Sequence, residues 1–314
     1  MSNQCLYCYH LLDGGALDYH PACSKKLFGV AVPPVLPYSE AQIQELAVEV
    51  VRSQFALTGV QAKLSLDIVS GENKQAPKRF TIVGLWGQFI LKPPSDHYPS
   101  LPELEDLTMH LAELSDIKTV PHGLIRLGQS LAYITKRVDR VNGKKLHMED
   151  MCQITDKLTE DKYRGSYEQI AKAINSYADN PGLDVIEFYE QVLFSFLTGN
   201  ADMHLKNFSL LKKASNSYLL CPAYDMVATA LVVPNDKEEL ALNLNGKKRK
   251  IKRGDFLVAM QRAGIPAKAI ENIFSKFATS IPSWQPFIAK SFLPLEMKEQ
   301  FWALVQNKAR QIEL

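Results

Sequence analysis

The sequence lacks any apolar run long enough to cross a membrane as a helix. No stretch approaches about 18 uninterrupted apolar residues. The first ten residues, MSNQCLYCYH, contain no basic segment followed by an apolar core, so no signal peptide is predicted. The net charge is only +2, which indicates neither a nucleic acid nor a membrane surface as a bulk partner. We therefore expect a cytoplasmic protein with no membrane partner.

Cysteine is also scarce, with five residues in a chain of 314. That number is too small for a disulfide scaffold and fits a reducing compartment. Three of the cysteines nevertheless form, with one histidine, the pattern Cys-x2-Cys…His-x2-Cys: Cys5, Cys8, His20 and Cys23. Three thiolates and an imidazole are a tetrahedral donor set for Zn²⁺, so a structural zinc site is predicted. The alternative is that these cysteines pack, half-buried and without a metal, among neighbouring tyrosines.

The length of the chain and its hydrophobic pattern predict two lobes. Apolar residues make up 46% of the chain, enough for a large core. Strands are expected around a glycine turn in residues 55–69, as hairpins in 78–94 and 208–227, and in 130–140. Helices are expected at residues 40–55, 102–116, 167–178 and 185–199 and, with short breaks, from 252 to the end. The first lobe is therefore small and β-rich, and the second is larger and mainly helical.

The stretch LTGNADMHLKNFSLL places Asp202, His204, Lys206 and Asn207 between two apolar segments. Asp202 and Asn207 have the Asp-x4-Asn spacing of the kinase catalytic loop, in which the Asp accepts the substrate hydroxyl proton and the Asn holds Mg²⁺. A loop of that length lets both oxygens converge on the γ-phosphate. The alternative is turn and cap chemistry between a helix and a strand.

Four further residues follow the order of a kinase. Asp225 comes after an apolar strand and would be the second metal ligand. Lys92 ends the strand FILK and would reach the phosphates, and Glu105 on the next helix would hold that lysine. Gly59, in the turn LTGVQAK, would cover the phosphates with backbone N–H groups. Turn chemistry explains Asp202 and Asn207 alone but not this ordered set.

Together, several long segments resemble the HipA-like serine/threonine kinases, which are the toxins of bacterial toxin–antitoxin systems. The segments are GNADMHLKNFSLL, PAYDMVAT, TGVQAKL, FILKP, RVDR…HMEDMCQ and LALNLNGKKRKIKRGDFL, and the resemblance runs from roughly Gln42 to the C-terminus. It implies an α+β, two-lobed protein-kinase-like fold that uses ATP and Mg²⁺. The implied divisions are a Cys/His segment and linker in residues 1–40, a small lobe with the phosphate-binding loop in 41–135, and a helical lobe with the catalytic loop in 136–314.

The resemblance also assigns roles by position. Asp202 would be the general base, His204 would lie near the transferring phosphate, and Asn207 and Asp225 would bind Mg²⁺. Lys136 to Val138 would form the hinge beside adenine, where Gln153 is a looser candidate. The residues implied to bind the nucleotide are Gly59, Val60, Gln61, Lys63, Lys92, Glu105, Lys136, Val138, Asp139 and Asp225.

The chain departs from the family pattern in three places. Only about forty residues precede the matching region, as in the short HipT-like toxins, whose missing subdomain is a separate small protein. The loop that is autophosphorylated in the family reads Ala56-Leu57-Thr58-Gly59 here, so Thr58 is the remaining autophosphorylation candidate; the alternative is an ordinary strand residue. The hinge carries Lys136 and Val138 where acidic and aromatic residues are common.

The resemblance further implies a target and partners. The target would be a serine or threonine of a protein, in particular an aminoacyl-tRNA synthetase, whose inactivation stops translation. The partners would be a helix-turn-helix antitoxin, through which alone operator DNA is contacted, and a small protein that replaces the missing subdomain. Two alternatives remain open: a small-molecule kinase, and a nucleotide-binding regulatory module without kinase activity.

Overall fold

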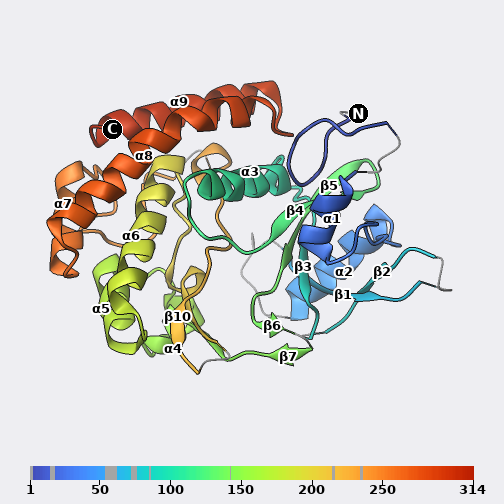
Figure 1. The fold of residues 1–314 in the computed structure, drawn as a ribbon, viewed down its shortest axis with the longest axis horizontal. Helices are drawn as coiled ribbons and strands as arrows, with labels where there is room; N and C mark the ends of the chain where they lie inside the picture. Colours follow the sequence, from blue (N-terminus) through green and yellow to red (C-terminus); the bar gives the residue numbers. More distant parts are fainter. Residues whose placement is uncertain are drawn as a thin grey trace. The chain divides into compact units, whose positions relative to one another are not determined.

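The computed structural model describes residues 3–14, 18–53, 62–71, 76–84, 86–141, 143–213, 216–233 and 236–314. These residues form two compact units. Unit 1 comprises residues 1–106 and 120–138, and unit 2 comprises residues 107–119 and 139–314. The helix α3 (Leu101–Leu114) contributes residues to both units. Figure 1 shows the helices and strands of the chain as a ribbon coloured along the sequence.

An antiparallel sheet forms the centre of unit 1. Its strands lie in the order β2-β1-β3-β5-β4, as far as the described residues show. Their bounds are β1 (Leu64–Val69), β2 (Arg79–Ile82), β3 (Phe89–Lys92), β4 (His122–Leu127) and β5 (Ser130–Lys136). The hairpin predicted in residues 78–94 is therefore wrong, because β2 and β3 do not pair with each other and instead lie on either side of β1.

The pairing of β1 with both neighbours follows from its buried leucines. Leu66 is opposite Ile82 on one side and Phe89 on the other, so one apolar position of β1 serves two strands. Gly87 lies in the connection that brings the chain back across β1. A Cβ atom on Gly87 would lie 2.5 Å from the Leu66 carbonyl oxygen, so only glycine fits this close approach.

Two helices of unit 1 differ in how well the sequence predicts them. The helix α2 (Glu40–Ser53) begins where expected, with Ser39 and Gln42 bonding each other's backbone N–H groups as a capping box. The helix α1 (Pro21–Phe28) was not predicted and ends at Gly29, whose φ is 78°. Phe28 of α1 packs edge-on against Phe80 of β2, so this short helix supplies part of the core.

Unit 2 is mainly helical. Its long helices are α5 (Tyr167–Tyr177), α6 (Pro181–Thr198), α7 (Arg253–Arg262), α8 (Ala267–Ala289) and α9 (Leu295–Gln311), as predicted from periodicity. A short helix α4 (Met151–Ile154) and a sheet of order β10-β9-β8 complete the part that leads to the loop after α6. The strands of this sheet are β8 (Met148–Asp150), β9 (Ser209–Lys212) and β10 (Tyr218–Leu220), and the predicted hairpin of β9 and β10 is confirmed.

The helix α6 is central in unit 2. It is apolar almost all round and packs against α5, α8 and α9, as a fully buried helix must. The predicted strand of residues 130–140 is shorter than expected, because β5 ends at Lys136 and the next pairing, β6 (Arg140–Val141) with β7 (Lys144–Lys145), starts afresh. Among the described residues, no helix combines the length and apolar character that a membrane crossing requires.

Replacing Trp284 should destabilise unit 2 strongly. Its indole is fully buried, packs edge-on against Phe194 and donates to the Ser115 hydroxyl at 3.1 Å. We expect Trp284→Ala to lower the free energy of unfolding by about 3–5 kcal/mol, measured by urea unfolding followed by circular dichroism. The control is Trp86→Ala, since Trp86 is 72% exposed and should change stability by less than about 0.5 kcal/mol. Equal effects of the two variants would contradict this packing.

Candidate active site

The lysine and glutamate predicted to pair in unit 1 are in contact. Lys92 Nζ lies 2.5 Å from Glu105 Oε1, and the two residues are only 3% and 1% exposed. Lys92 ends β3, where strand alternation turns it away from the face that buries Phe89 and Leu91. Its ammonium also lies 5.4 Å from the centre of the Tyr133 ring on β5. The buried contact with Glu105 therefore fixes the position of Lys92 Nζ.

The loop after α6 is shaped at its entrance by Gly199, whose φ is 66°. A Cβ atom there would lie 2.8 Å from Leu304 and 3.0 Å from Ala230, so both the conformation and the space require glycine. Asn200 then accepts a hydrogen bond from the Asp202 N–H at 3.1 Å through its side-chain oxygen. The backbone before Asp202 is therefore set by local hydrogen bonds.

Asp202 and Asn207 belong to one rigid loop. The Asn207 side-chain N–H donates to the Asp202 carbonyl oxygen at 2.9 Å, and Asn207 is only 4% exposed. This bond uses the amide nitrogen of Asn207, so the amide oxygen, the atom that would bind a metal ion, is not needed for it. The Asp202 side chain is 41% exposed. The loop thus holds a buried amide and a solvent-accessible carboxylate at a fixed spacing.

Tyr163 contacts the predicted general base and was not predicted from the sequence. Its hydroxyl donates to Asp202 Oδ1, and its ring packs edge-on against His204 with centres 4.9 Å apart. Burial, reinforced by the negative charge of Asp202, raises the pKa of the Tyr163 hydroxyl well above its ordinary value. The phenol therefore stays protonated and presents a hydroxyl to the carboxylate.

His204 is neutral in this loop. Burial lowers its pKa to about 4, and within the described residues its Nδ1 has no hydrogen-bond partner. Its Nε2 lies 4.0 Å from Asp202 Oδ1. At neutral pH, His204 therefore adds no positive charge beside Asp202.

Asp225 lies beyond β10 with a φ of 59°. The preceding Tyr224 donates to the Lys206 carbonyl oxygen at 3.0 Å and contacts the Ser209 hydroxyl at 2.6 Å, which connects this segment to the loop that holds Asp202 and Asn207. Asp225 is near enough for its charge to contribute to the raised pKa of Tyr163. The structure thus brings Asp202, Asn207 and Asp225 into one region of unit 2.

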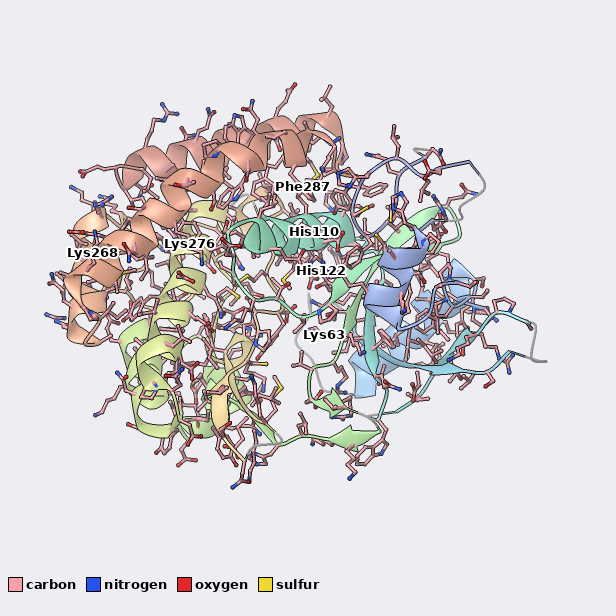
Figure 2. All side chains as sticks on the ribbon, in the orientation of Figure 1. Lys63, His110, His122, Lys268, Lys276 and Phe287 are labelled. Atoms are coloured by element: carbon pink, nitrogen blue, oxygen red, sulfur yellow. The ribbon has the colours of Figure 1, made fainter. Side chains whose placement is uncertain are left out.

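The remaining candidate residues have varied surroundings. Lys63 is exposed just before β1 (Figure 2). Lys136 ends β5 with its N–H donating to Pro121, and Val138 follows at the end of unit 1. Asp139 is buried and forms an ion pair with Arg140. The candidates Thr58, Gly59, Val60 and Gln61 lie outside the described residues, so their predicted roles stay predictions.

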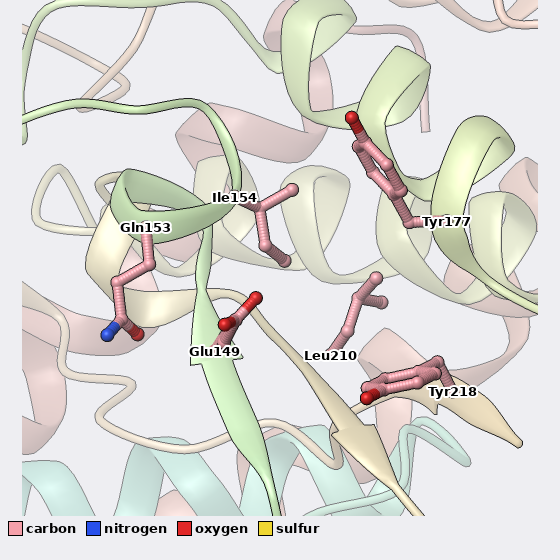
Figure 3. A pocket seen from close by; sticks show the side chains of 6 residues that line it. All are labelled: Glu149, Gln153, Ile154, Tyr177, Leu210 and Tyr218. Atoms are coloured by element: carbon pink, nitrogen blue, oxygen red, sulfur yellow. The ribbon is translucent and has the colours of Figure 1, made fainter. Parts of the chain in front are cut away.

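Gln153 caps the helix α4 together with Asp150. Its side chain accepts from the Asp150 N–H while Asp150 accepts from the Gln153 N–H, which caps α4. Asp150 also binds the Lys206 ammonium at 2.9 Å, so this cap supports the loop that holds Asp202 and Asn207. Figure 3 shows Gln153 at a pocket of about 340 Å³ whose lining residues are Glu149, Gln153, Ile154, Tyr177, Leu210 and Tyr218. Asp202, Asn207 and Asp225 do not line that pocket.

The chain belongs to the family of the HipA-like C-terminal domain, whose family model matches residues 55–285. The resemblance noted in the sequence is thereby confirmed. The chain is 32% identical over 250 residues to a Sinorhizobium fredii protein named "Putative kinase Y4dM", covering 75% of this chain and 57% of that protein. It is 30% identical over 211 residues to a Haemophilus influenzae protein named "Putative kinase", covering 63% of this chain and 59% of that protein. It thus spans less than two thirds of these relatives.

Two solved structures share the fold. HipA of Shewanella oneidensis, solved with HipB and operator DNA, has a TM-score of 0.67 at 20% identity over 82% of this chain and 65% of its own. The proinflammatory kinase CtkA of Helicobacter pylori has a TM-score of 0.55 at 15% identity over 79% of this chain and 93% of its own. The predicted α+β, protein-kinase-like fold is confirmed.

Replacing only one partner of the Lys92–Glu105 pair should lower the free energy of unfolding more than replacing both. Lys92→Met takes away the cation that Glu105 contacts, and we expect a loss of about 3–5 kcal/mol in the free energy of unfolding. The double variant Lys92→Met with Glu105→Leu should recover most of that loss, since no buried carboxylate remains. Urea unfolding measures both, with Lys78→Met on the exposed side of unit 1 as the control. Additive losses in the double variant would contradict the pairing.

His204 should make stability depend on pH. Its pKa is about 4 when folded and about 6.5 when unfolded, so the unfolded chain binds more protons between these values. Stability is therefore present above pH 6.5 and falls as the pH drops toward 4. We expect the free energy of unfolding to fall between pH 7 and pH 5 in the unchanged chain, and to fall by about 2 kcal/mol less in His204→Gln. Urea unfolding at the two pH values measures this difference. Identical pH slopes would show that His204 protonates freely in the fold.

Proposed function

We propose that the chain is an ATP-dependent protein kinase. The observation that carries the proposal is the loop that fixes Asp202 and Asn207 through one hydrogen bond, with Asp225 close by in unit 2. The buried Lys92–Glu105 pair of unit 1 supports it, since an immobilised ammonium is suited to a phosphate. The names of the relatives are consistent with the same activity.

The donor set of unit 2 fits Mg²⁺. A carboxylate and an amide oxygen, from Asp225 and Asn207, are the hard oxygen ligands that this ion takes when it also binds phosphates and water. When bound, the metal and ATP supply an activated phosphoryl group and neutralise its charge. Lys92 binds the nucleotide phosphates, and Glu105 orients Lys92. Neutral His204 adds no positive charge beside Asp202 in unit 2.

Asp202 acts as the base for the acceptor hydroxyl. Its half-exposed carboxylate is accessible to a protein side chain, and the Tyr163 hydroxyl already donates a hydrogen bond to Oδ1. An acceptor serine or threonine replaces the Tyr163 hydroxyl at that oxygen and gives its proton to Asp202 as phosphate is transferred. The high pKa of the Tyr163 hydroxyl keeps it protonated, so it remains a hydrogen-bond donor to Asp202 Oδ1.

The finer assignments follow the family. We propose that the protein substrate is an aminoacyl-tRNA synthetase phosphorylated on serine or threonine, so that the chain acts as the toxin of a toxin–antitoxin system. The Shewanella oneidensis relative was solved with HipB and operator DNA, which supports a helix-turn-helix antitoxin as partner and DNA contact through that partner. A separate small subdomain-like protein is proposed as a third component. Thr58 remains the proposed autophosphorylation site.

Removing the base should abolish transfer. The purified protein with Mg²⁺ and γ-labelled ATP in a bacterial lysate should label a protein of synthetase size, and Asp202→Asn should reduce labelling about 10²–10⁴-fold. The control is Asp116→Asn, because Asp116 is exposed and has a φ of 53° that asparagine also tolerates.

The outcomes separate the proposals. Label on Thr58 alone would establish a kinase and leave the synthetase target unsupported. Label on a small metabolite would replace the protein-kinase proposal with a small-molecule kinase. Bound ATP without any transfer would overturn the kinase proposal in favour of a regulatory module.

A further inference from the structure

The start of unit 1 gathers three thiols and an imidazole at one point. The ligand atoms of Cys5, Cys8, His20 and Cys23 all lie within 4.8 Å of one another. His20 Nδ1 lies 3.4 Å from Cys8 Sγ and 3.8 Å from Cys23 Sγ. A tetrahedral site with Zn–S bonds of about 2.3 Å and Zn–N bonds of about 2.0 Å separates sulfur from nitrogen by about 3.6 Å. The observed spacing is thus that of ligands around one ion.

Two local structures deliver these ligands. Cys5 and Cys8 bracket a tight turn in which the Tyr9 N–H donates to the Cys5 carbonyl oxygen at 3.0 Å, and Tyr9 has a φ of 62°. His20 is the N-cap of α1 and Cys23 lies in its first turn. This arrangement, a turn facing a helix start, is how Cys-x2-Cys and His-x2-Cys pairs converge on a metal.

The histidine is held in the tautomer that a metal needs. His20 Nε2 lies 3.0 Å from the Leu11 carbonyl oxygen. A carbonyl oxygen only accepts, so we assign the proton to Nε2, and Nδ1 then points a lone pair toward the sulfurs. A backbone carbonyl that orients a ligating imidazole is the usual outer partner of a metal site.

We propose that Cys5, Cys8, His20 and Cys23 bind one Zn²⁺ ion, with His20 ligating through Nδ1. Four protein donors complete a tetrahedron and leave no open position, so the ion is structural. Cys5 is fully buried, and Cys8 and Cys23 are half-buried, so a metal would be shielded from exchange. The ion holds a segment that is too short to be stabilised by a core of its own.

The zinc-held segment is fastened to the sheet and to α3 within unit 1. Tyr9 follows Cys8 directly and donates its hydroxyl to Asp106 Oδ2 at 2.7 Å. Asp106 Oδ1 lies 2.7 Å from His122 Nδ1 on β4, and the Leu124 N–H donates to Leu6 at 3.0 Å. Asp106 is the neighbour of Glu105, the partner of Lys92. The metal therefore supports the part of α3 that carries Glu105, and Tyr9 and Asp106 are positioning residues.

The metal content of the full chain tests the site. After purification under reducing conditions, we expect inductively coupled plasma mass spectrometry to find one zinc ion per chain. Cys8→Ser and Cys23→Ser should lose the metal, Cys221→Ser outside the cluster should keep it, and His20→Cys should keep it with four thiolates. The proposal would be overturned if the protein contained no zinc and, with all five thiols reduced, bound no Co²⁺. It would also be overturned if both serine variants retained zinc.

A second measurement does not depend on the variants folding. Reduced, metal-free full chain titrated with Co²⁺ should develop the visible bands of a tetrahedral cobalt–thiolate site, and added Zn²⁺ should abolish them. Hydrogen exchange at the Leu124 amide should speed up when the metal is removed and slow again when it is restored. If the purified protein instead carried a Cys5–Cys8 disulfide, and gave no cobalt bands once that disulfide had been reduced, the site would bind no metal. None of these readouts requires ATP, so they stand apart from the kinase proposal.

Discussion

The buried ion pair of Lys92 and Glu105 connects β3 to the first part of α3 in unit 1. Two charges removed from water are stable only while they contact each other. The end of β3 and the first part of α3 must therefore stay close enough for Lys92 to reach Glu105. Three features position the two side chains. They are the alternation of side chains along β3, the hydrogen bonds of Asp106 with Tyr9 and His122, and the Tyr133 ring beside the Lys92 ammonium. A purely structural core would not need such a pair, since apolar side chains of similar volume fill the same space without a desolvation penalty.

Unit 2 builds its site by backbone constraint rather than by buried charge. Gly199 ends the central helix, Asn200 and Thr229 hold the backbone before Asp202, and Asn207 bonds back to the Asp202 carbonyl oxygen. The Asp202 carboxylate is therefore placed by its neighbours and still reaches solvent. The Tyr163 hydroxyl donates to Asp202 Oδ1, and in the proposed mechanism a substrate hydroxyl would compete with it for that oxygen.

Local pattern was enough for most elements of unit 2 and for placing Asp202 and Asn207 in one loop. The helices α5 and α6 and the β9–β10 hairpin follow from periodicity and turn residues, and the Asp-x4-Asn spacing lies within one loop. Pattern failed where partners are distant in sequence. Nothing local shows that β2 and β3 lie on either side of β1, and Tyr163 is 39 residues from Asp202. The strand β4 and the helix α1 were missed, the latter because it is short and its apolar residues come at its end.

The affinity of the full chain for ATP, measured by calorimetry with and without Mg²⁺, tests the central claim most directly. We expect that Mg²⁺ strengthens ATP binding, that Asp225→Asn removes this dependence, and that Lys92→Met weakens binding whether or not the metal is present. An affinity that is the same with and without Mg²⁺, in the unchanged chain and in both variants, would contradict it.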